Sequence, residues 1–239
     1  MIRRYFEGLS RFEAAFVVAV ACLAVAGIGF AFRPHSDGGG STAPRPTATA
    51  EKLPVVVSSS EPALIDAAWE RSEMGLPPPP GSDASLTERV LDEIREKTLV
   101  MAGIRAQVGT RCEGGQVTVK KGEWTLCTAS YQGVELVWEV LVEDVTGGGA
   151  WTVQLIDYQV FPPDSGVLLA KAVHGRFWAQ HHEHAKELRC DRIPPLKRVT
   201  LDEDTGYRCQ YLDVDGDVPR WVNTKVILDA AGPVFREIE

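Results

Sequence analysis

Basic residues are scarce in this chain beyond its first 33 positions. Those positions hold four arginines against two glutamates, whereas the rest of the chain holds 21 Lys and Arg against 31 Asp and Glu. Binding to nucleic acid or to an anionic lipid surface requires clustered basic side chains that neutralise phosphates. The acidic balance therefore predicts no nucleic-acid partner, although it leaves room for a local basic patch.

Common catalytic motifs are absent as well. The sequence contains no G-x-S-x-G, no Walker motif and no G-x-G-x-x-G. The acidic stretch that begins at Asp213 resembles a calcium loop only superficially, because Thr224 stands where an EF-hand needs its glutamate. We therefore predict a protein without enzymatic activity and without a cofactor.

Histidines are few, but four of the five lie between His174 and His184. The HHEH string at 181–184 lacks the H-E-x-x-H spacing of zinc proteases. On a helix, His181 and His184 would form an i, i+3 pair, which makes them weak candidates for a metal site. We favour a solvated histidine face near a helix C-terminus, where positive charge interacts favourably with the helix dipole. Sensing of pH or of a metal by this helix stays open.

One long apolar run is present near the N-terminus. Residues 14–32 include no charged side chain, and as a helix they would span about 28 Å, close to the hydrocarbon thickness of a bilayer. Three arginines precede the run and one follows it, so the positive-inside rule predicts a transmembrane helix with a cytoplasmic tail at 1–13 and an extracytoplasmic remainder. The length of the run and the lack of an A-x-A site disfavour a cleaved signal peptide. Cys22 lies in the middle of the run, which disfavours a lipoprotein signal.

The next segment, 33–84, is rich in Pro, Ser, Thr and Gly. Such a composition cannot bury a core and predicts a linker. Within it, Ser60 can cap a short helix near 61–73 that places Leu64 and Ile65 on one face. This helix would dock on the folded part or bind a partner, and we favour docking.

Two modules of α+β character follow, at 85–162 and 163–239. In the first, Ser85 and Glu88 fit a capping box, and the spacing of apolar residues predicts a helix over 86–101. Period-2 alternation then predicts three or four antiparallel strands. The alternating residues are Val117, Val119, Trp124, Leu126, Leu136, Trp138, Val140 and Val142.

The second module repeats this order. Residues 165–190 have an apolar helical face, and the residues after 197 alternate again, with turns expected at Gly206, at the DG pair and at AAG. The predicted fold class is thus α+β: an N-terminal transmembrane helix, a disordered linker and two tandem modules, each a helix with an antiparallel sheet.

The two modules share an ordered set of residues. Each has Arg-Cys after the helix, a glycine and an aromatic residue before a second cysteine, then a glycine turn and a strand that contains tryptophan. The positions are Arg111, Cys112, Gly122, Trp124, Cys127, Gly133 and Trp138 in the first copy, and Arg189, Cys190, Gly206, Tyr207, Cys209, Gly216 and Trp221 in the second.

This internal repeat constrains the cysteines. Four of them in an extracytoplasmic setting suggest disulfides, and two equivalent modules most simply pair internally, Cys112 with Cys127 and Cys190 with Cys209. Each bridge would tie the end of a helix to the second strand and stabilise its module by about 3 kcal/mol. Free buried cysteines are the alternative.

The segments "RCEGGQVTVKKGEWTLCTASYQGVELVWEV" and "RCDRIPPLKRVTLDEDTGYRCQYLDVDGDVPRWVNTKV" resemble a known kind of domain. They are similar to the small two-cysteine α+β domains of unknown function in actinobacterial envelope proteins with a single membrane helix. The resemblance covers 85–239, departs in the longer inter-cysteine segment of the second copy, and implies no activity. A weaker, fold-level analogy is to cystatin-like extracytoplasmic domains of secretion or conjugation components.

These features predict a membrane-anchored, extracytoplasmic, non-catalytic binding or assembly protein of the cell envelope. Its partner would be another envelope protein or a wall component. The alternative is a structural component of a secretion or conjugation apparatus. A third possibility, an envelope hydrolase or a metal-binding protein, has the least support.

Overall fold

The computed structural model describes residues 51–65, 70–147, 154–214 and 218–238, which all belong to one structural unit, Thr49–Glu239. The predicted tail at 1–13 and the predicted transmembrane helix at 14–32 lie outside these residues. Among the described residues, no helix has the length and apolar character needed to cross a membrane. The fold class of this unit is α+β, as predicted, with two α-helices and antiparallel sheets.

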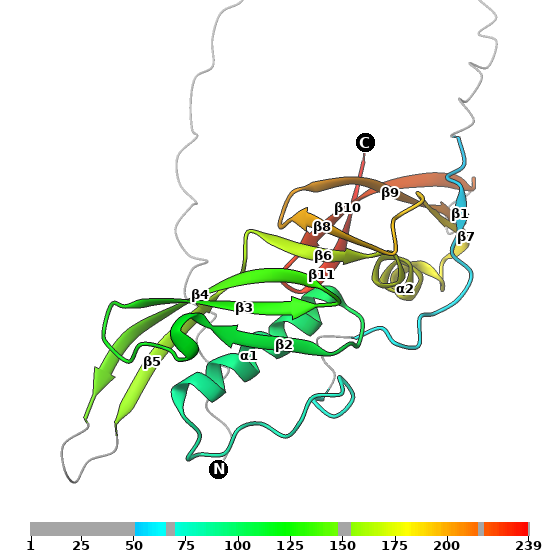
Figure 1. The fold of residues 1–239 in the computed structure, drawn as a ribbon. Helices are drawn as coiled ribbons and strands as arrows, with labels where there is room; N and C mark the ends of the chain where they lie inside the picture. Colours follow the sequence, from blue (N-terminus) through cyan, green and yellow to red (C-terminus); the bar gives the residue numbers. More distant parts are fainter. Residues whose placement is uncertain (1–50, 66–69, 148–153, 215–217, 239) are drawn as a thin grey trace, which may run out of the picture. The chain divides into compact units, whose positions relative to one another are not determined.

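The first half is a helix packed on a four-stranded meander (Figure 1). Its elements are α1 (Leu86–Ala102), β2 (Val108–Cys112), the 3-10 turn η1 (Glu113–Gly115), β3 (Trp124–Tyr131), β4 (Val134–Thr146) and β5 (Leu155–Phe161). The sheet order is β2-β3-β4-β5, with every neighbouring pair antiparallel. Strand β2 is missing from the sequence prediction, and Val117 and Val119 lie outside the strands.

Helix α1 begins and ends where its sequence dictates. The Ser85 hydroxyl accepts a hydrogen bond from the Glu88 backbone, and the Glu88 carboxylate accepts one from the Ser85 N–H at 2.7 Å, which completes the predicted capping box. Gly103 ends the helix in the left-handed conformation, with φ of 70°. The helix predicted over 86–101 is confirmed to within one residue.

The second half repeats the arrangement with two additions. Its elements are β6 (Ser165–Leu169), α2 (Ala170–His181), β7 (Ala185–Cys190), β8 (Leu196–Thr200), β9 (Asp204–Asp213), β10 (Arg220–Asp229) and β11 (Gly232–Glu237). The main sheet has the order β1-β7-β9-β10-β11, in which β1 (Val55–Val56) joins from the N-terminal segment. Strands β6 and β8 form a separate antiparallel pair.

The prediction that 165–190 is helical is wrong at both ends. Helix α2 covers only twelve of these residues. Before it, the buried strand β6 pairs with β8, and after it β7 pairs with β9. The sequence misleads because "AKELRC" consists largely of good helix formers, whereas sheet pairing and the position of Cys190 decide its structure.

The repeat appears in space, with two corrections. Cys112 lies directly opposite Cys127, and Cys190 directly opposite Cys209. One bridge therefore joins β2 to β3 and the other joins β7 to β9, so neither joins a helix end to a strand. Trp138 lies opposite Cys127, but Thr224, not Trp221, takes the equivalent place opposite Cys209. Gly216 lies outside the described residues.

Gly206 was expected in a turn and instead lies inside β9. Lys225 pairs with Arg208, but Ile227 pairs with Asp204, so β9 carries extra residues at this point. Gly206 has a φ of 78°, which a bulged strand accommodates best with glycine.

The two halves share one hydrophobic core. Gly166 of β6 lies where they meet: a Cβ added there would come within 2.7 Å of Met101 on α1 and of Leu228 on β10. The boundary predicted between 162 and 163 falls between β5 and β6, yet buried side chains are continuous across it. Each half therefore depends on the other for part of its burial.

The segment predicted as a linker packs on this unit from residue 51 onward, except at 66–69, which the structure does not describe. Strand β1 pairs with β7, and Ile65 and Met74 are buried in the core. Docking was favoured from the sequence, but residues 61–65 and 70–73 do not form the helix predicted near 61–73. These residues form turns, and Leu64 forms an isolated bridge with Ile104.

Arg71 fixes this segment to α1. Its guanidinium donates to both carboxylate oxygens of Asp92, at 2.8 and 2.9 Å, and also to Glu96. The same group donates to the Pro77 carbonyl at 3.2 Å. Asp92 is buried, so the bidentate pair supplies the charge that its carboxylate requires.

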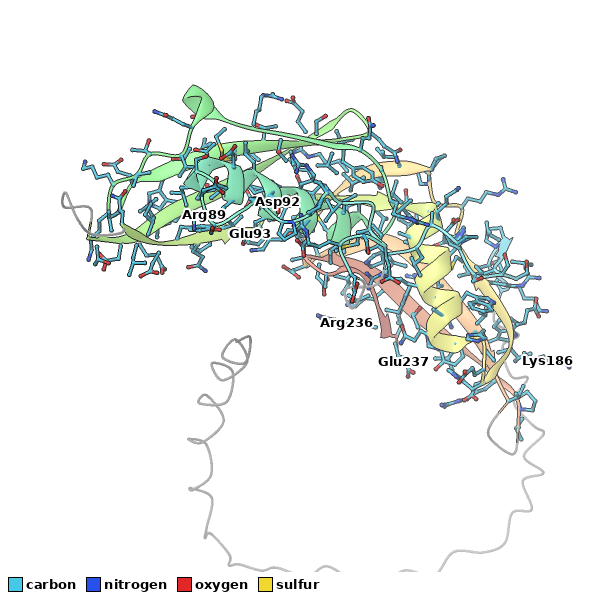
Figure 2. All side chains as sticks on the ribbon, turned by 90° about the horizontal axis from the view of Figure 1, so that it is seen from below. Arg89, Asp92, Glu93, Lys186, Arg236 and Glu237 are labelled. Carbon is cyan, nitrogen blue, oxygen red and sulfur yellow. A yellow bond between two sulfur atoms is a disulfide. The ribbon has the colours of Figure 1, made fainter. Side chains whose placement is uncertain are left out.

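We expect Arg71→Ala to lower the free energy of unfolding by about 2 kcal/mol, because Asp92 would keep only its longer contact with Arg95. Amide hydrogen exchange should also become faster around Pro77. Chemical denaturation and exchange measurements check both effects. Arg89→Ala is the matched control, since Arg89 lies on the exposed side of the same helix (Figure 2), and its loss should change stability by less than about 0.5 kcal/mol.

Candidate functional site

The two candidate metal ligands from the sequence lie close together. His181 is the last residue of α2, and His184 lies in the turn that leads to β7. Nδ1 of His181 and Nε2 of His184 are 3.1 Å apart and share a hydrogen bond. The His181 ring stacks on Tyr211, with ring centroids 4.3 Å apart, and contacts Phe177 at 4.8 Å.

The expectation of a solvated histidine face is wrong for His181, which is only 6% exposed. Because α2 ends at this residue, the chain turns and the second sheet covers the ring. Burial, with a smaller contribution from His184, lowers the pKa of His181 to about 4, and Glu237 opposes the shift in part. Of the described histidines, only His182 is exposed, and it stacks on Trp178.

This histidine pair is packed among aromatic rings. The described residues contain no group of three or more His, Cys, Asp and Glu side chains that could hold a metal ion. The carboxylate facing the pair, Glu237, accepts a hydrogen bond from the Tyr211 hydroxyl at 3.0 Å. His181 and His184 therefore give two ligands at most.

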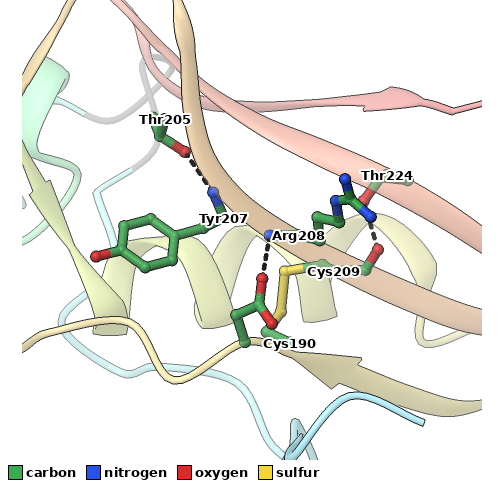
Figure 3. The surroundings of a disulfide bond; sticks show 7 residues. Cys190, Thr205, Tyr207, Arg208, Cys209 and Thr224 are labelled. Atoms are coloured by element: carbon green, nitrogen blue, oxygen red, sulfur yellow. Dashed lines mark hydrogen bonds between the residues drawn. A yellow bond between two sulfur atoms is a disulfide. The ribbon is translucent and has the colours of Figure 1, made fainter. Parts of the chain in front are cut away.

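The four cysteines outside the apolar run form the two predicted pairs. Cys112 bonds to Cys127 and Cys190 to Cys209, with Cα atoms 3.9 and 4.0 Å apart. The second bridge lies inside the sheet, where the Thr224 hydroxyl donates to the Cys209 carbonyl at 3.0 Å (Figure 3). All described cysteines are thus in disulfides, which leaves none of them as a nucleophile.

A different group of residues stands out on the sheet of the first half. Its outer face, opposite to α1, has a contiguous set of apolar side chains that we call the Trp124 face. The face consists of Trp124, Leu126, Val137, Leu141 and Phe161.

Strand register makes these residues neighbours. Trp124 of β3 lies opposite Leu141 of β4. In the next row on the same face, Glu139 of β4 lies between Leu126 of β3 and Phe161 of β5. Val137 continues the patch along β4. The rings of Trp124 and Phe161 lie with centroids 5.3 Å apart. Trp124 is 51% exposed, Val137 46% and Leu126 37%, so the patch presents substantial apolar area to solvent.

Acidic side chains accompany this apolar patch. Glu139 and Asp157 have no ionic partner among the described residues, and both belong to the outer face. At the rim, Glu135 pairs with Arg111 and Asp144 with Lys121. The Trp124 face thus combines aromatic and aliphatic contact area with unpaired negative charge.

The alternating pattern in the sequence groups Trp124 and Leu126 with Trp138. In the structure Trp138 is buried, whereas Trp124 and Leu126 are exposed. Successive residues of a strand face opposite sides, and Cys127 is buried together with Cys112, so its neighbour Leu126 faces outward. The predicted disulfide was the signal that could have identified this face.

Comparison with known proteins adds no assignment. No protein-family model, no curated protein and no solved structure matches this chain.

Proposed function

We propose that this chain is a membrane-anchored, extracytoplasmic, non-catalytic protein of the cell envelope that binds a protein partner through the Trp124 face. The observation that carries the proposal is the contiguous apolar patch on a sheet face that the described residues leave uncovered, with Trp124 half exposed at its edge. Apolar patches that stay exposed on a folded protein typically mark interaction sites.

The two disulfides and the N-terminal sequence support the proposed compartment. Disulfides are typical of oxidising, extracytoplasmic environments. The uncharged run at 14–32, preceded by three arginines, has the length and charge pattern of a single membrane-spanning helix with a cytoplasmic N-terminus.

The chemistry of the face favours a protein partner. Trp124 and Phe161 offer rigid aromatic area, which dominates the energetics of many protein interfaces. Glu139 lies in the middle of the patch without an ionic partner among the described residues, so a partner that supplies Lys or Arg would satisfy it. The alternative function, a structural component of a secretion or conjugation apparatus, would use the same surface.

We expect a photoreactive amino acid at Val137 in the full-length, membrane-embedded chain to give one discrete crosslinked protein product. Because Trp124 is the largest exposed side chain of the face, adding Trp124→Ala should reduce this product about tenfold or more, as hot-spot residues do. Adding Glu139→Lys should reduce it as well. Quantitative immunoblotting measures all three yields.

The same probe at Glu113, which is exposed in η1 and outside the face, is the control and should give no such product. Equal yields at Val137 and Glu113, or a yield at Val137 that is indifferent to Trp124→Ala, would refute the face as a binding site.

A further inference from the structure

The outer face of the second sheet carries a row of positive charge. Lys225 of β10 lies directly opposite Arg208 of β9 on one side and directly opposite Arg236 of β11 on the other. Directly opposed residues of antiparallel strands point to the same side of a sheet, so three cationic side chains lie next to one another. Arg236 lies near the exposed C-terminal end of β11, next to Glu237 (Figure 2). We call Arg208, Lys225 and Arg236 the basic row.

This row is not neutralised within the part of the chain that the structure describes. None of its three side chains forms an ion pair there. The Asp191 carboxylate accepts a hydrogen bond from the Arg208 backbone N–H at 2.7 Å and forms no ion pair with the Arg208 side chain (Figure 3). Like charges placed directly opposite destabilise a sheet. Three of them in a chain of net charge −8 suggest that an anionic surface covers the row in the functional state.

Apolar side chains lie on the same side of the sheet as the basic row, beyond the intervening pair of Gln210 and Asn223. Trp221 and Leu212 are directly opposite each other there, both are only partly buried, and the Lys52 ammonium lies 5.3 Å from the centroid of the Trp221 ring. Val56 of β1 adds a side chain that is 53% exposed. The outer face of the second sheet therefore combines apolar area with unpaired positive charge.

This combination is complementary to the Trp124 face, where apolar area is combined with the unpaired carboxylates of Glu139 and Asp157. We infer that the partner of the Trp124 face is a second copy of this chain, and that the face packs against the basic row and Trp221 of the neighbouring copy. The inference rests on the proposed function and names the partner of the same site.

The geometry of such a contact is that of two sheets packed face to face. Each contributes long antiparallel strands, β3 and β4 on one side and β9 and β10 on the other. The contact uses different patches on the two copies, so each copy keeps one face free for the next, and association closes into a ring or continues as an open array. Anchoring in one membrane would raise the effective concentration of the copies and allow a weak contact to suffice.

An anionic lipid surface is the competing occupant of the basic row. The net charge of −8 disfavours it, because the field of the whole chain repels such a surface, whereas the Trp124 face supplies carboxylates and apolar area together.

The test is a charge-reversal exchange with full-length chains in detergent micelles, in which two differently tagged copies are mixed and co-purified. We expect Glu139→Lys/Asp157→Lys to weaken self-association about tenfold or more, and Lys225→Glu/Arg236→Glu to do the same. A mixture of the two variants should recover co-purification, because the unaltered row of one variant meets the unaltered Trp124 face of the other and the two reversed surfaces also complement each other. Wild-type association should weaken as salt rises.

The matched control is Arg89→Glu/Arg192→Glu. Both arginines are exposed and have no ionic partner among the described residues, so this variant should leave association unchanged.

Several results would overturn the inference and separate it from the proposed function. A mixture that fails to recover, or a wild-type chain that does not self-associate, excludes the second copy. If only the Lys225→Glu/Arg236→Glu variant changes behaviour, and that change is lost in micelles free of anionic lipid, the row binds lipid instead. A Val137 crosslink to a different protein excludes the second copy but keeps the Trp124 face as a binding site, and no crosslink at all removes the face itself.

Discussion

The Cys190→Ala/Cys209→Ala variant is expected to lose about 3 to 5 kcal/mol of its free energy of unfolding. The bridge closes a sequence separation of 19 residues, so its removal restores conformational freedom to the unfolded chain. Both cysteines are also fully buried, and β1 is paired at Cys190, so the change reaches the edge of the sheet. Urea denaturation with and without reductant measures the loss.

The bridge between Cys112 and Cys127 provides the matched comparison. Its sequence separation is 15, so the entropic contribution should be nearly the same, about 3 kcal/mol. A cost below about 1 kcal/mol for either double variant would contradict the assigned roles. Reductant should destabilise the wild-type chain and leave a variant that lacks all four cysteines unchanged.

The second large effect is on the pH dependence of stability. His181 has a pKa of about 4 in the folded state, well below its ordinary value of 6.5. We expect the free energy of unfolding to fall by about 3 kcal/mol as the pH drops from 6.5 to 4, and the His181→Phe variant to lose most of this dependence. The aromatic replacement keeps a ring against Tyr211.

The sign follows from proton binding. Below pH 6.5 the unfolded chain protonates this histidine, whereas the folded chain holds it neutral until about pH 4, so acid favours the unfolded state throughout that window. Burial also lowers the pKa of His174, which adds a dependence of the same sign that His181→Phe leaves in place. Thermal or urea unfolding at a series of pH values tests the prediction. His182→Phe, at the exposed neighbouring position, should keep the full wild-type dependence.

Local signals in the sequence were sufficient for some elements. The capping box at Ser85 and the spacing of apolar residues defined α1 almost to the residue, because a capped amphipathic helix is specified within its own segment. The order of cysteines in the two copies gave both disulfide pairs, since equivalent modules place equivalent residues in contact. The β10–β11 turn, expected at AAG, also lies where predicted.

Elements that depend on distant partners were missed. Strand β7 has helix-forming residues and becomes a strand because β9 and β1 pair with its two edges. Strand β6 has five residues, and its conformation depends on β8, some 30 residues later in the chain. Neither partner can be read from the local pattern, so tertiary pairing overrides propensity there.

The candidate binding face was also missed, for a related reason. Trp124 and Leu126 look like core residues when hydrophobicity alone is counted, and only the inward direction of Cys127 reveals that they face solvent. The basic row was missed because its residues are far apart in the sequence. Arg208, Lys225 and Arg236 are spread over nearly thirty residues, and net charge gives no sign that strand register brings them together.

Strand β1 has a mechanical consequence. Tension that reaches the folded unit from its N-terminal side acts on Lys52 and Leu53, which contact Glu187 and Arg189 of β7, and then on this two-residue strand. Its ladder with β7 is short and can peel away one residue at a time, whereas β7 itself is fastened to β9 by the covalent bridge at Cys190, directly opposite Val55. We therefore expect a pulled molecule to yield in two steps: a small release of β1 at low force, and a barrier at the disulfide that force alone does not cross. Strand β1 would therefore detach under load while the disulfide keeps β7 attached to β9.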